Sequence, residues 1–370
     1  MVSAVDRATV DVYDQRGGQW AARRRPVRRA DARRFGGTLG KGARCVDLGC
    51  GAGRYTADLG ASVIGLDASR GMLELCRQAA PGIPLVQADL ESLPFGRCTV
   101  HGAWANMSYL HVPSVRLPAA LADLHGVLAT GAALDIQVLA GDYEGHALPD
   151  DDVGGRFFAA WGPEALRDVL VGAGFVVEHS TVDGDALRAR CIRARTLPDT
   201  VGPRMRLLVV GLNPSLYAAD AGVGFARPGN RFWPAAIATG LVTRDRDPVH
   251  ALHAHGMGMT DLVKRATTGA GELAATEYRT GMQRVERSVA WLRPAAVCFV
   301  GLAGWRAAVD RHAVAGQQEC ELGGRPVYVM PSTSGANAGS SLQTLATHLA
   351  AAITLADQSA TVREVHKGVR

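Results

Sequence analysis

The chain has 370 residues, enough for two domains, and its 47% hydrophobic and 20% charged residues are typical of globular proteins. The formal net charge is +5, and residues 200–370 carry 18 Lys and Arg against 12 Asp and Glu, which permits a nucleic-acid partner without requiring one. No apolar run reaches the roughly 18 residues of a membrane span, and the seven Cys form no C-x-x-C pair, so we expect no membrane partner, no metal site and a reduced, cytoplasmic protein.

Short apolar segments alternate with helical segments from residue 45 onward. Such alternation predicts a mostly parallel, doubly wound α/β sheet. A helix is expected over 161–175, because Pro163 lies near its start and Gly174 at its end. The expected strands of this part lie at 44–49, 62–67, 84–89 and 132–139.

A second α/β pattern begins after a segment rich in Pro and Gly, which predicts a linker at 196–204. One face of a helix is expected over 275–292, where apolar residues recur at spacings of 4, 3, 4 and 3. The expected domains are 1–195 and 205–356, with a tail at 357–370. Strands are expected at 206–212, 295–301 and 325–330, and a last helix at 341–356.

The stretch "VDLGCGAGRYT" places glycines directly after the first expected strand, where they permit a tight turn and close backbone approach to a ligand. Carboxylates follow at the ends of the next two strands, where they can accept hydrogen bonds from ribose hydroxyls and an adenine amino group. The G-x-G-x-G spacing differs from that of dinucleotide folds, although a nicotinamide-binding fold stays open as an alternative. The candidate residues are Asp47, Gly49, Gly51, Gly53, Asp67 and Asp89.

With "VIGLDAS", "QADLESLPF" and "EALRDVLVGAGF" in order, residues 10–195 resemble class I S-adenosylmethionine-dependent methyltransferases. The resemblance implies a Rossmann-like fold, S-adenosylmethionine as cofactor, and contacts to it from the candidate glycines and carboxylates. It places Asn106 near the transferred methyl group. The methyl acceptor stays unknown, because "ANMSYLH" lacks the Asn-Pro-Pro-Tyr pattern of base amino-methylation. His101, Tyr109 and His111 are possible acceptor-side groups or packed residues.

Four polar loops follow elements of the second unit: "GLNPS" (211–215), "GFARPGNRFW" (224–233), "GMGMTDLVKRAT" (256–267) and "MPSTSGANAG" (330–339). Because the carboxyl ends of parallel strands share one edge of a sheet, these loops can converge on one pocket. Their motifs, at these spacings, resemble the mismatch-specific uracil/thymine-DNA glycosylases of the uracil-DNA glycosylase superfamily over about 205–352. The resemblance implies a three-layer α/β/α fold and excision of uracil or thymine mispaired with guanine in double-stranded DNA.

By this resemblance Asn213 holds the attacking water and Phe225 stacks on the flipped base. Since an Asn side chain cannot ionise, slow turnover without any cofactor is expected. The backbone at Leu212 would receive the developing negative charge of the leaving base. The side chains of Ser332 and Ser334 would contact the DNA backbone or close the pocket, and Lys264 either contacts a phosphate or lies at a solvated helix end.

The resemblance also implies a wedge at 335–338 that enters the gap left by the flipped nucleotide. This chain reads Gly335, Ala336 and Asn337 there, where family wedges carry a larger residue or an Arg. Only Asn337 is expected to hydrogen-bond the unpaired guanine. Ala338 lies outside the residues described below.

Three hypotheses follow from the two resemblances. The first is a fused enzyme that combines a methyltransferase with a base-excision glycosylase, and it is associated with the nucleoid when it acts on DNA. The second is a small-molecule methyltransferase with a non-catalytic nucleic-acid-binding module. The third is a nucleic-acid methyltransferase that uses the glycosylase-like unit for targeting. We prefer the first because the second unit retains the loops that carry chemistry as well as the fold.

Overall fold

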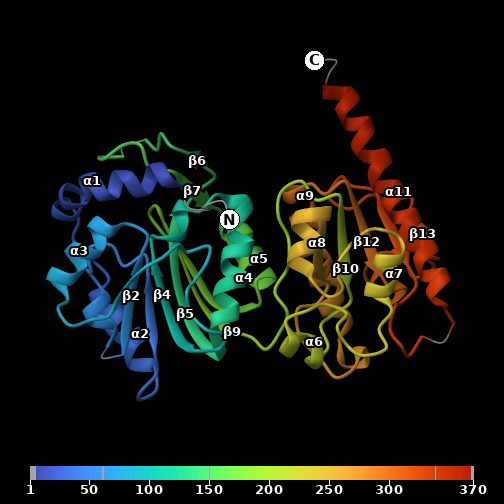
Figure 1. Ribbon diagram of the computed structural model, residues 1–370, viewed down its shortest axis with the longest axis horizontal. Helices are drawn as coiled ribbons and strands as arrows, with labels where there is room; N and C mark the ends of the chain where they lie inside the picture. Colours follow the sequence, from blue (N-terminus) through green and yellow to red (C-terminus); the bar gives the residue numbers. More distant parts are fainter. Residues whose placement is uncertain (1–5, 61, 150, 338, 368–370) are drawn as a thin grey trace. The chain divides into compact units, whose positions relative to one another are not determined.

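A computed structural model describes residues 6–60, 62–149, 151–337 and 339–367. The chain divides into two compact units: the first ends at Ala194 and the second begins at Arg195 (Figure 1). Each unit has its own sheet and its own core, and we describe each one separately.

The first unit is built on a nine-stranded sheet whose central strands are parallel. Its first strand is fully buried, as expected for a short apolar run at the centre of a parallel sheet. In sheet order the strands are β3 (Leu85–Gln87), β2 (Val63–Asp67), β1 (Cys45–Leu48), β4 (Val100–Asn106), β5 (Leu128–Ala140), β7 (Phe158–Trp161) and β6 (Glu144–Gly145), with β9 (Ala186–Arg193) beside β5 and β8 (Phe175–Asp183) beside β9.

Polar side chains begin two helices of this unit. The Asp6 carboxylate accepts a hydrogen bond from the Thr9 amide (3.1 Å), and the Ser69 hydroxyl accepts one from the Met72 amide (3.1 Å). These side chains satisfy amides that the first helical turn leaves without partners. The helices are α1 (Arg7–Arg23), α2 (Arg29–Thr38), α3 (Arg70–Ala79), α4 (Leu117–Val127) and α5 (Pro163–Gly172).

The second unit is a five-stranded sheet between two layers of helices. The strand β10 shows why both faces are covered: Leu207 and Val209 point into one core, and Leu208 and Val210 into the other. In sheet order the strands are β11 (Met257–Asp261), β10 (Leu207–Gly211), β12 (Ala296–Val300), β14 (Val327–Met330) and the antiparallel β13 (Gly316–Gln317). The three-layer α/β/α prediction is confirmed.

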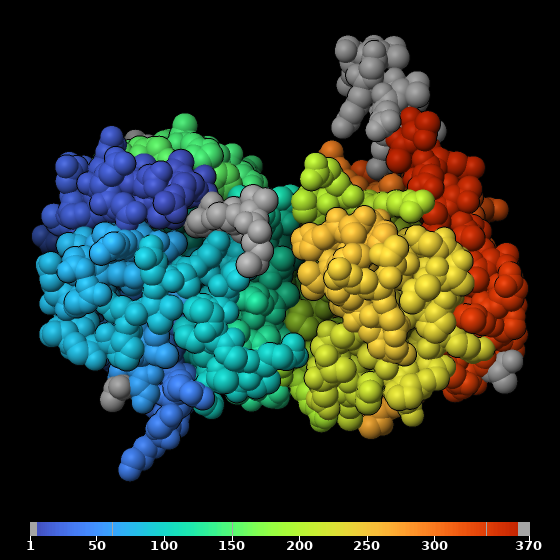
Figure 2. All heavy atoms as spheres, viewed as in Figure 1, coloured from blue at the N-terminus to red at the C-terminus, as the bar shows by residue number. Residues whose placement is uncertain are grey.

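Two groups of helices form the outer layers of this unit. One core contains residues of α7 (Phe232–Ala238), α8 (Pro248–His255) and α11 (Leu342–Lys367). The opposite core contains residues of α9 (Ala275–Leu292) and α10 (Leu302–Ala308). The short α6 (Leu216–Ala221) follows β10, and Figures 1 and 2 show α11 in red along one side of the unit.

Two segments differ from their expected roles. Residues 196–204, expected as a linker, pack into the second unit: Thr196 and Val201 are buried, and Thr200 exchanges two backbone hydrogen bonds with Met259. Residues 357–367, expected as a tail, continue α11, and Asp357 pairs with Arg206 at 2.7 Å. The polar side chains Thr196 and Asp199 of the first segment bond within the second unit, to the Lys264 carbonyl and to buried cations, although the composition resembles that of a loop.

A buried ion cluster anchors residue 199. The Asp199 carboxylate accepts from the Lys264 ammonium (2.6 Å) and from the Arg284 guanidinium (3.1 Å). These cations hold the pKa of Asp199 below its ordinary value against the opposing effect of burial, the largest single influence. The cluster joins residues 196–204 to the segment after β11 and to α9.

We expect Asp199→Ala to destabilise the second unit by about 3–5 kcal/mol, because it leaves two buried cations without their carboxylate. The matched control is Asp220→Ala, which removes an exposed pair with Arg195 and should cost under about 1 kcal/mol. Chemical unfolding followed by circular dichroism measures both. Equal effects of the two substitutions would contradict the anchoring role.

Candidate functional site

In the sheet of the first unit, β1 lies between β2 and β4. The strand order therefore runs to one side of β1 from β2 to β3 and to the other side from β4 to β5. Ligands of open α/β sheets bind at the carboxyl ends of strands at such a switch point. A cavity of about 530 Å³ lies there. Its lining includes most of the candidate cofactor residues, namely Asp47, Gly49, Gly51, Asp67, Asp89 and Asn106.

The glycines of the loop after β1 have positive φ angles, which glycine adopts without strain. A side chain at Gly49 would also overlap that of Ser108. The cavity lining does not include Gly53; a Cβ there would lie 2.8 Å from the Cys76 sulfur. Gly53 therefore permits close packing of the loop on α3, outside the cavity lining.

Asp67 supports this loop from the end of β2. Its carboxylate oxygens accept from the Gly51 amide (2.9 Å) and the Ser69 amide (2.9 Å). Burial raises the pKa of Asp67 to about 6, although both hydrogen bonds oppose the rise. Each oxygen keeps a lone pair for a ligand hydroxyl.

The other two carboxylates have different surroundings. Asp47 is 3% exposed and accepts from the Thr56 hydroxyl at 2.7 Å, and burial raises its pKa to about 7. Asp89 is half-buried at the end of β3, where it accepts from the Glu91 amide at 2.9 Å. Asp47 thus ties the end of β1 to Thr56, and Asp89 contributes a half-buried carboxylate to the cavity lining.

Asn106 is oriented by a buried arginine. The Arg28 guanidinium donates to the Asn106 Oδ1 (3.0 Å) and to Asp135 (2.8 Å). Because its oxygen is engaged, Asn106 offers its amide NH₂ group to the cavity. The cavity floor therefore carries a donor at the place expected for the methyl group.

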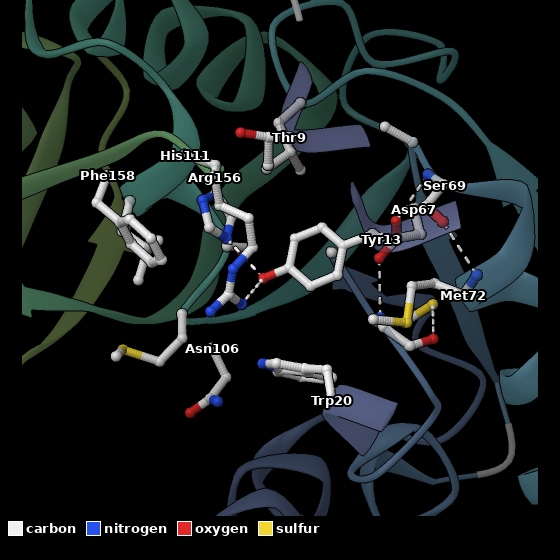
Figure 3. Close-up of a pocket in the computed structure, with 18 of the residues that line it drawn as sticks. Thr9, Tyr13, Trp20, Asp67, Ser69, Met72, Asn106, His111, Arg156 and Phe158 are labelled. Atoms are coloured by element: carbon white, nitrogen blue, oxygen red, sulfur yellow. Dashed lines mark hydrogen bonds between the residues drawn. The ribbon is translucent and has the colours of Figure 1, made fainter. Parts of the chain in front are cut away.

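Three residues form a further polar group in the cavity (Figure 3). His111 Nδ1 lies 2.6 Å from the Phe157 carbonyl, which accepts, so Nε2 accepts from the Tyr13 hydroxyl at 2.9 Å. The Arg156 guanidinium donates to the Tyr13 oxygen (2.9 Å). Burial lowers the pKa of His111 to about 4, so its imidazole is neutral near pH 7.

Sequence reasoning identified His111 as a possible acceptor-side group but missed Tyr13 and Arg156. These two residues are 143 positions apart, and neither belongs to a motif of the loop after β1. Of the other two acceptor-side candidates, Tyr109 is fully buried, and His101 is exposed and absent from the cavity lining.

In the second unit, Asn213 lies where the chain leaves β10 beside the segment that follows β11. Its Nδ2 donates to the Thr267 hydroxyl (2.8 Å) and to the carbonyls of Arg265 (3.0 Å) and Pro214 (3.2 Å). These acceptors fix the orientation of the amide. Among the described residues none donates to Oδ1, so this oxygen is the acceptor that the side chain presents.

Phe225 occupies the adjoining loop in a left-handed conformation with φ 56°. One face of its ring stacks on the buried Phe232, with centroids 4.4 Å apart and planes at 24°. The Trp233 indole N–H donates to the Gly224 carbonyl (2.8 Å), which fixes the loop. Since Phe225 is only half-buried, its ring can still stack on a planar ligand.

Asp261, at the end of β11, lies beside Gly211 and the tip of the Phe225 ring. A side chain at Gly211 would overlap the Asp261 carboxylate, so glycine is required there. The lining of a small cavity contains both Phe225 and Asp261. Burial raises the pKa of Asp261 to about 6, the nearby Asp199 adds to the rise, and Lys264 opposes it. Sequence reasoning missed this carboxylate, although it lies within the quoted segment 256–267.

We expect Asp261→Asn to change how stability depends on pH. A pKa of about 6 in the fold, against about 3.9 in the unfolded chain, means that the carboxyl group favours folding only when protonated. Its contribution is complete below about pH 4, falls as the pH rises through 6, and is absent above.

Relative to the parent, the free energy of unfolding of Asp261→Asn should therefore rise on the order of 2–3 kcal/mol as the pH increases from 4 to 8, because a pKa difference of two units is worth this much. Urea unfolding at both pH values gives the difference. A constant offset between the two proteins would show that the group does not titrate in this range.

Lys264 does not fit its expected contact with DNA. Its side chain is only 9% exposed, and its ammonium group is paired with the Asp199 carboxylate at 2.6 Å. Leu212, also predicted here, accepts from the Val263 amide through its carbonyl (2.9 Å), which holds the strand end in place.

The remaining predicted residues lie in the loop after β14. The Ser332 hydroxyl accepts from the Ser334 amide (3.3 Å), and the Ser334 hydroxyl accepts from the Ala336 amide (3.3 Å). Both hydroxyl protons stay available to a ligand oxygen. Gly335 and Ala336 are exposed, and Asn337 is half-buried.

Two further features bear on the predicted partners. Within the described part of the chain, no helix is long and apolar enough to cross a membrane. Among the same residues, no group of three or more His, Cys, Asp or Glu side chains is placed to hold a metal ion.

Comparison with known proteins assigns each unit. Residues 45–131 match the family model "Methyltransferase domain", and residues 198–354 match "Uracil DNA glycosylase superfamily". The solved structures with similar folds include the DhpI–SAH complex, at 18% identity and a TM-score of 0.43, covering 52% of this chain and 99% of that chain.

Two others are similarly distant. One is the complex of a Haloferax volcanii putative methyltransferase with the Trm112 activator (17% identity, TM-score 0.43, 50% of this chain and 97% of that chain). The other is a Thermotoga maritima S-adenosylmethionine-dependent methyltransferase, a possible histamine N-methyltransferase (17%, 0.40, 50% and 99%). From the two family matches, this chain joins a methyltransferase domain to a domain of the uracil DNA glycosylase superfamily.

Proposed function

We propose that the second unit is a DNA glycosylase that hydrolyses the bond between deoxyribose and an extruded uracil or related base. The observation that supports it best is the fixed amide of Asn213, which presents Oδ1 as an acceptor two residues after Gly211, where the tip of the Phe225 ring and the Asp261 carboxyl group lie. An oxygen held in this way can orient one water molecule toward the sugar. Phe225 supplies the stacking surface that grips a flipped base.

The proposed reaction has one covalent exchange. The water oxygen bonds to C1′ of the sugar, the C1′–N bond of the base breaks, and the base departs with the bonding electron pair. The departing base then takes a proton, and the attacking water loses one to solvent. Asn213 accepts a hydrogen bond from the water but cannot remove its proton, so it contributes mainly by positioning.

Selection of uracil or thymine as the excised base belongs to the same proposal. The pocket edge carries the Asp261 carboxyl group, which donates when protonated and accepts when ionised. A pyrimidine with both a ring N–H and carbonyl groups can satisfy either form. The hydroxyls of the half-buried Ser332 and the exposed Ser334 suit the phosphates on either side of the flipped nucleotide.

For the first unit we propose S-adenosylmethionine-dependent methyl transfer. The cavity residues suit this cofactor: Asp67 can accept from ribose hydroxyls, Asp89 from an adenine amino group, and Gly49 permits close backbone approach. When bound, the cofactor supplies an electrophilic methyl group. Asn106, Tyr13 and the neutral His111 lie in the same cavity, where they can orient an acceptor.

One experiment tests both activities of the full chain. Purified protein is incubated with labelled oligonucleotides that contain uracil, thymine, hypoxanthine or no lesion, with and without S-adenosylmethionine, and alkali then cleaves abasic products. Strand cleavage at uracil supports the glycosylase. Nucleic-acid binding without base release in any substrate contradicts it and favours a binding module. Binding of S-adenosylmethionine is measured in parallel by calorimetry, and its absence contradicts the proposal for the first unit.

A further inference from the structure

The loop that should fill the gap left by a flipped base is held by one arginine. The Arg231 guanidinium donates to the carbonyls of Ser334 (2.9 Å), Asn337 (2.7 Å) and Ser340. The backbone N–H of Arg231 donates to the Thr333 carbonyl at 3.0 Å. Carbonyls of residues 333, 334, 337 and 340 therefore converge on Arg231, which fixes the conformation of the loop at these residues.

The Asn337 amide turns back into this loop. Its Nδ2 donates to the Ser332 carbonyl (2.8 Å) and to the Ser340 hydroxyl (3.3 Å), and its Oδ1 accepts from the Gly339 amide (3.3 Å). Both donors and the acceptor are thus engaged within the loop. The expectation that Asn337 pairs with an unpaired guanine does not fit this arrangement.

The exposed part of the loop offers little to the opposite strand. Residues 334–336 are exposed and carry, in turn, a hydroxyl group, no side chain and one methyl group. Gly335 packs closely, since a Cβ there would lie 3.0 Å from the Gly229 carbonyl oxygen. This stretch has no side chain large enough to replace a base in the stack, and none with the paired donors and acceptors that read a base edge.

We infer that this glycosylase does not recognise the base opposite its target, and that the ease with which the target base leaves the helix sets its substrate range. The inference rests on the proposed glycosylase activity. Inserted side chains normally offset part of the cost of unstacking. Without such a side chain, nothing offsets the free-energy cost of unstacking the target base, and this cost is lowest for a single-stranded or mispaired base.

The two modes of selection rank substrates differently. Recognition of guanine would make uracil opposite guanine the best duplex substrate. Selection by pair stability places single-stranded uracil first. It puts uracil opposite cytosine or thymine at or above uracil opposite guanine, because the wobble pair with guanine is the more stable. Uracil opposite adenine comes last.

The test measures single-turnover base release by the full-length protein on one sequence that carries uracil in a single strand or opposite each of the four bases. We expect the stability ranking. Release opposite guanine more than about tenfold faster than opposite cytosine and thymine, or slower release from single strands than from the guanine duplex, would overturn the inference while leaving the glycosylase activity intact. No release from any of the five substrates would instead overturn the activity itself, and the inference with it.

A gain-of-function variant tests where the missing contact would lie. Ala336→Arg adds a guanidinium group that can bond both acceptors of a guanine edge, so the guanine-to-cytosine rate ratio should rise about tenfold. The matched control Ala336→Leu fills space without pairing, and it should raise release from all duplexes relative to single strands at an unchanged ratio. An unchanged ratio in Ala336→Arg would overturn the placement of residue 336 at the opposite strand.

Discussion

Asn213→Ala is expected to lower the single-turnover rate of uracil release by about 10²–10⁴-fold, the range over which positioned polar groups act in catalysis. The substitution removes the Oδ1 acceptor, the two donor contacts that tie the end of β10 to the segment after β11, and a third to the neighbouring Pro214 carbonyl. Because the water is no longer oriented, the reaction loses its nucleophile geometry, while stacking on Phe225 is preserved. Alkali cleavage of a uracil-containing strand measures the rate.

The matched control is Asn106→Ala, which removes the same amide from the other unit and should leave uracil release unchanged. Binding of the oligonucleotide, followed by fluorescence anisotropy, should change less than threefold in Asn213→Ala, since phosphate contacts dominate affinity. If Asn213→Ala released uracil at the parent rate, the water-positioning role would be wrong.

If Asn213→Ala lost both oligonucleotide binding and uracil release, disruption of the loop would explain it, and a second variant tests this explanation. Thr267→Val removes the acceptor of the shortest contact to Nδ2 but keeps Oδ1. We expect a smaller rate loss from it than from Asn213→Ala, with near-normal thermal unfolding. Equal losses would show that the side chain acts on folding of the loop rather than on the water.

Much of each site follows from the local sequence. The glycines after β1, and Asp67 at the end of β2, were predictable because parallel strands place their carboxyl ends at one edge. Asn213 was predictable for the same reason, since β10 is a short apolar run that ends in polar residues. The period of the apolar residues also predicted α9 with bounds that match the structure.

What escaped prediction depends on contacts between distant segments. Asp199 lies in a Pro-containing stretch that resembles a linker, and only its pairing with Lys264 and Arg284 shows that it is buried. The same pairing withdraws Lys264 from the surface. Nothing in the local pattern around Asn337 shows that its amide bonds to its own loop.

The Arg231 side chain illustrates a related limit. Arg231 directly precedes α7, and its backbone N–H donates to the Thr333 carbonyl. Its guanidinium donates to carbonyls of residues over 100 positions away in the sequence, and this arrangement depends on the tertiary fold. Long-range positioning roles of this kind need coordinates.

The second large effect is expected at Asp67, where Asp67→Asn should weaken S-adenosylmethionine binding by about 10²-fold or more. The parent carboxylate accepts from two backbone amides, at 2.9 Å each. An asparagine provides one oxygen, so its NH₂ group would face one of these N–H donors. Each lost bond to a charged acceptor is worth about 1.5–3 kcal/mol, so the loop that carries Gly51 would lose its preset conformation.

The pH dependence distinguishes the carboxylate from a general effect on the loop. Burial raises the pKa of Asp67 to about 6, and a ligand hydroxyl that donates to it favours the ionised form. Affinity of the parent should therefore rise about tenfold per pH unit up to about 6 and then level off, because below this pH binding must first release a proton. In Asp67→Asn this slope should disappear.

Calorimetric titration with S-adenosylmethionine from pH 5 to pH 8 measures both quantities, and buffers of different ionisation enthalpy report the released proton. The control Asp11→Asn changes an exposed carboxylate of α1 that pairs with Arg7 and lies outside the cavity lining, so its affinity should match that of the parent at every pH. If Asp67→Asn kept the slope of the parent, the titrating group would be Asp47, whose pKa of about 7 lies in the same window.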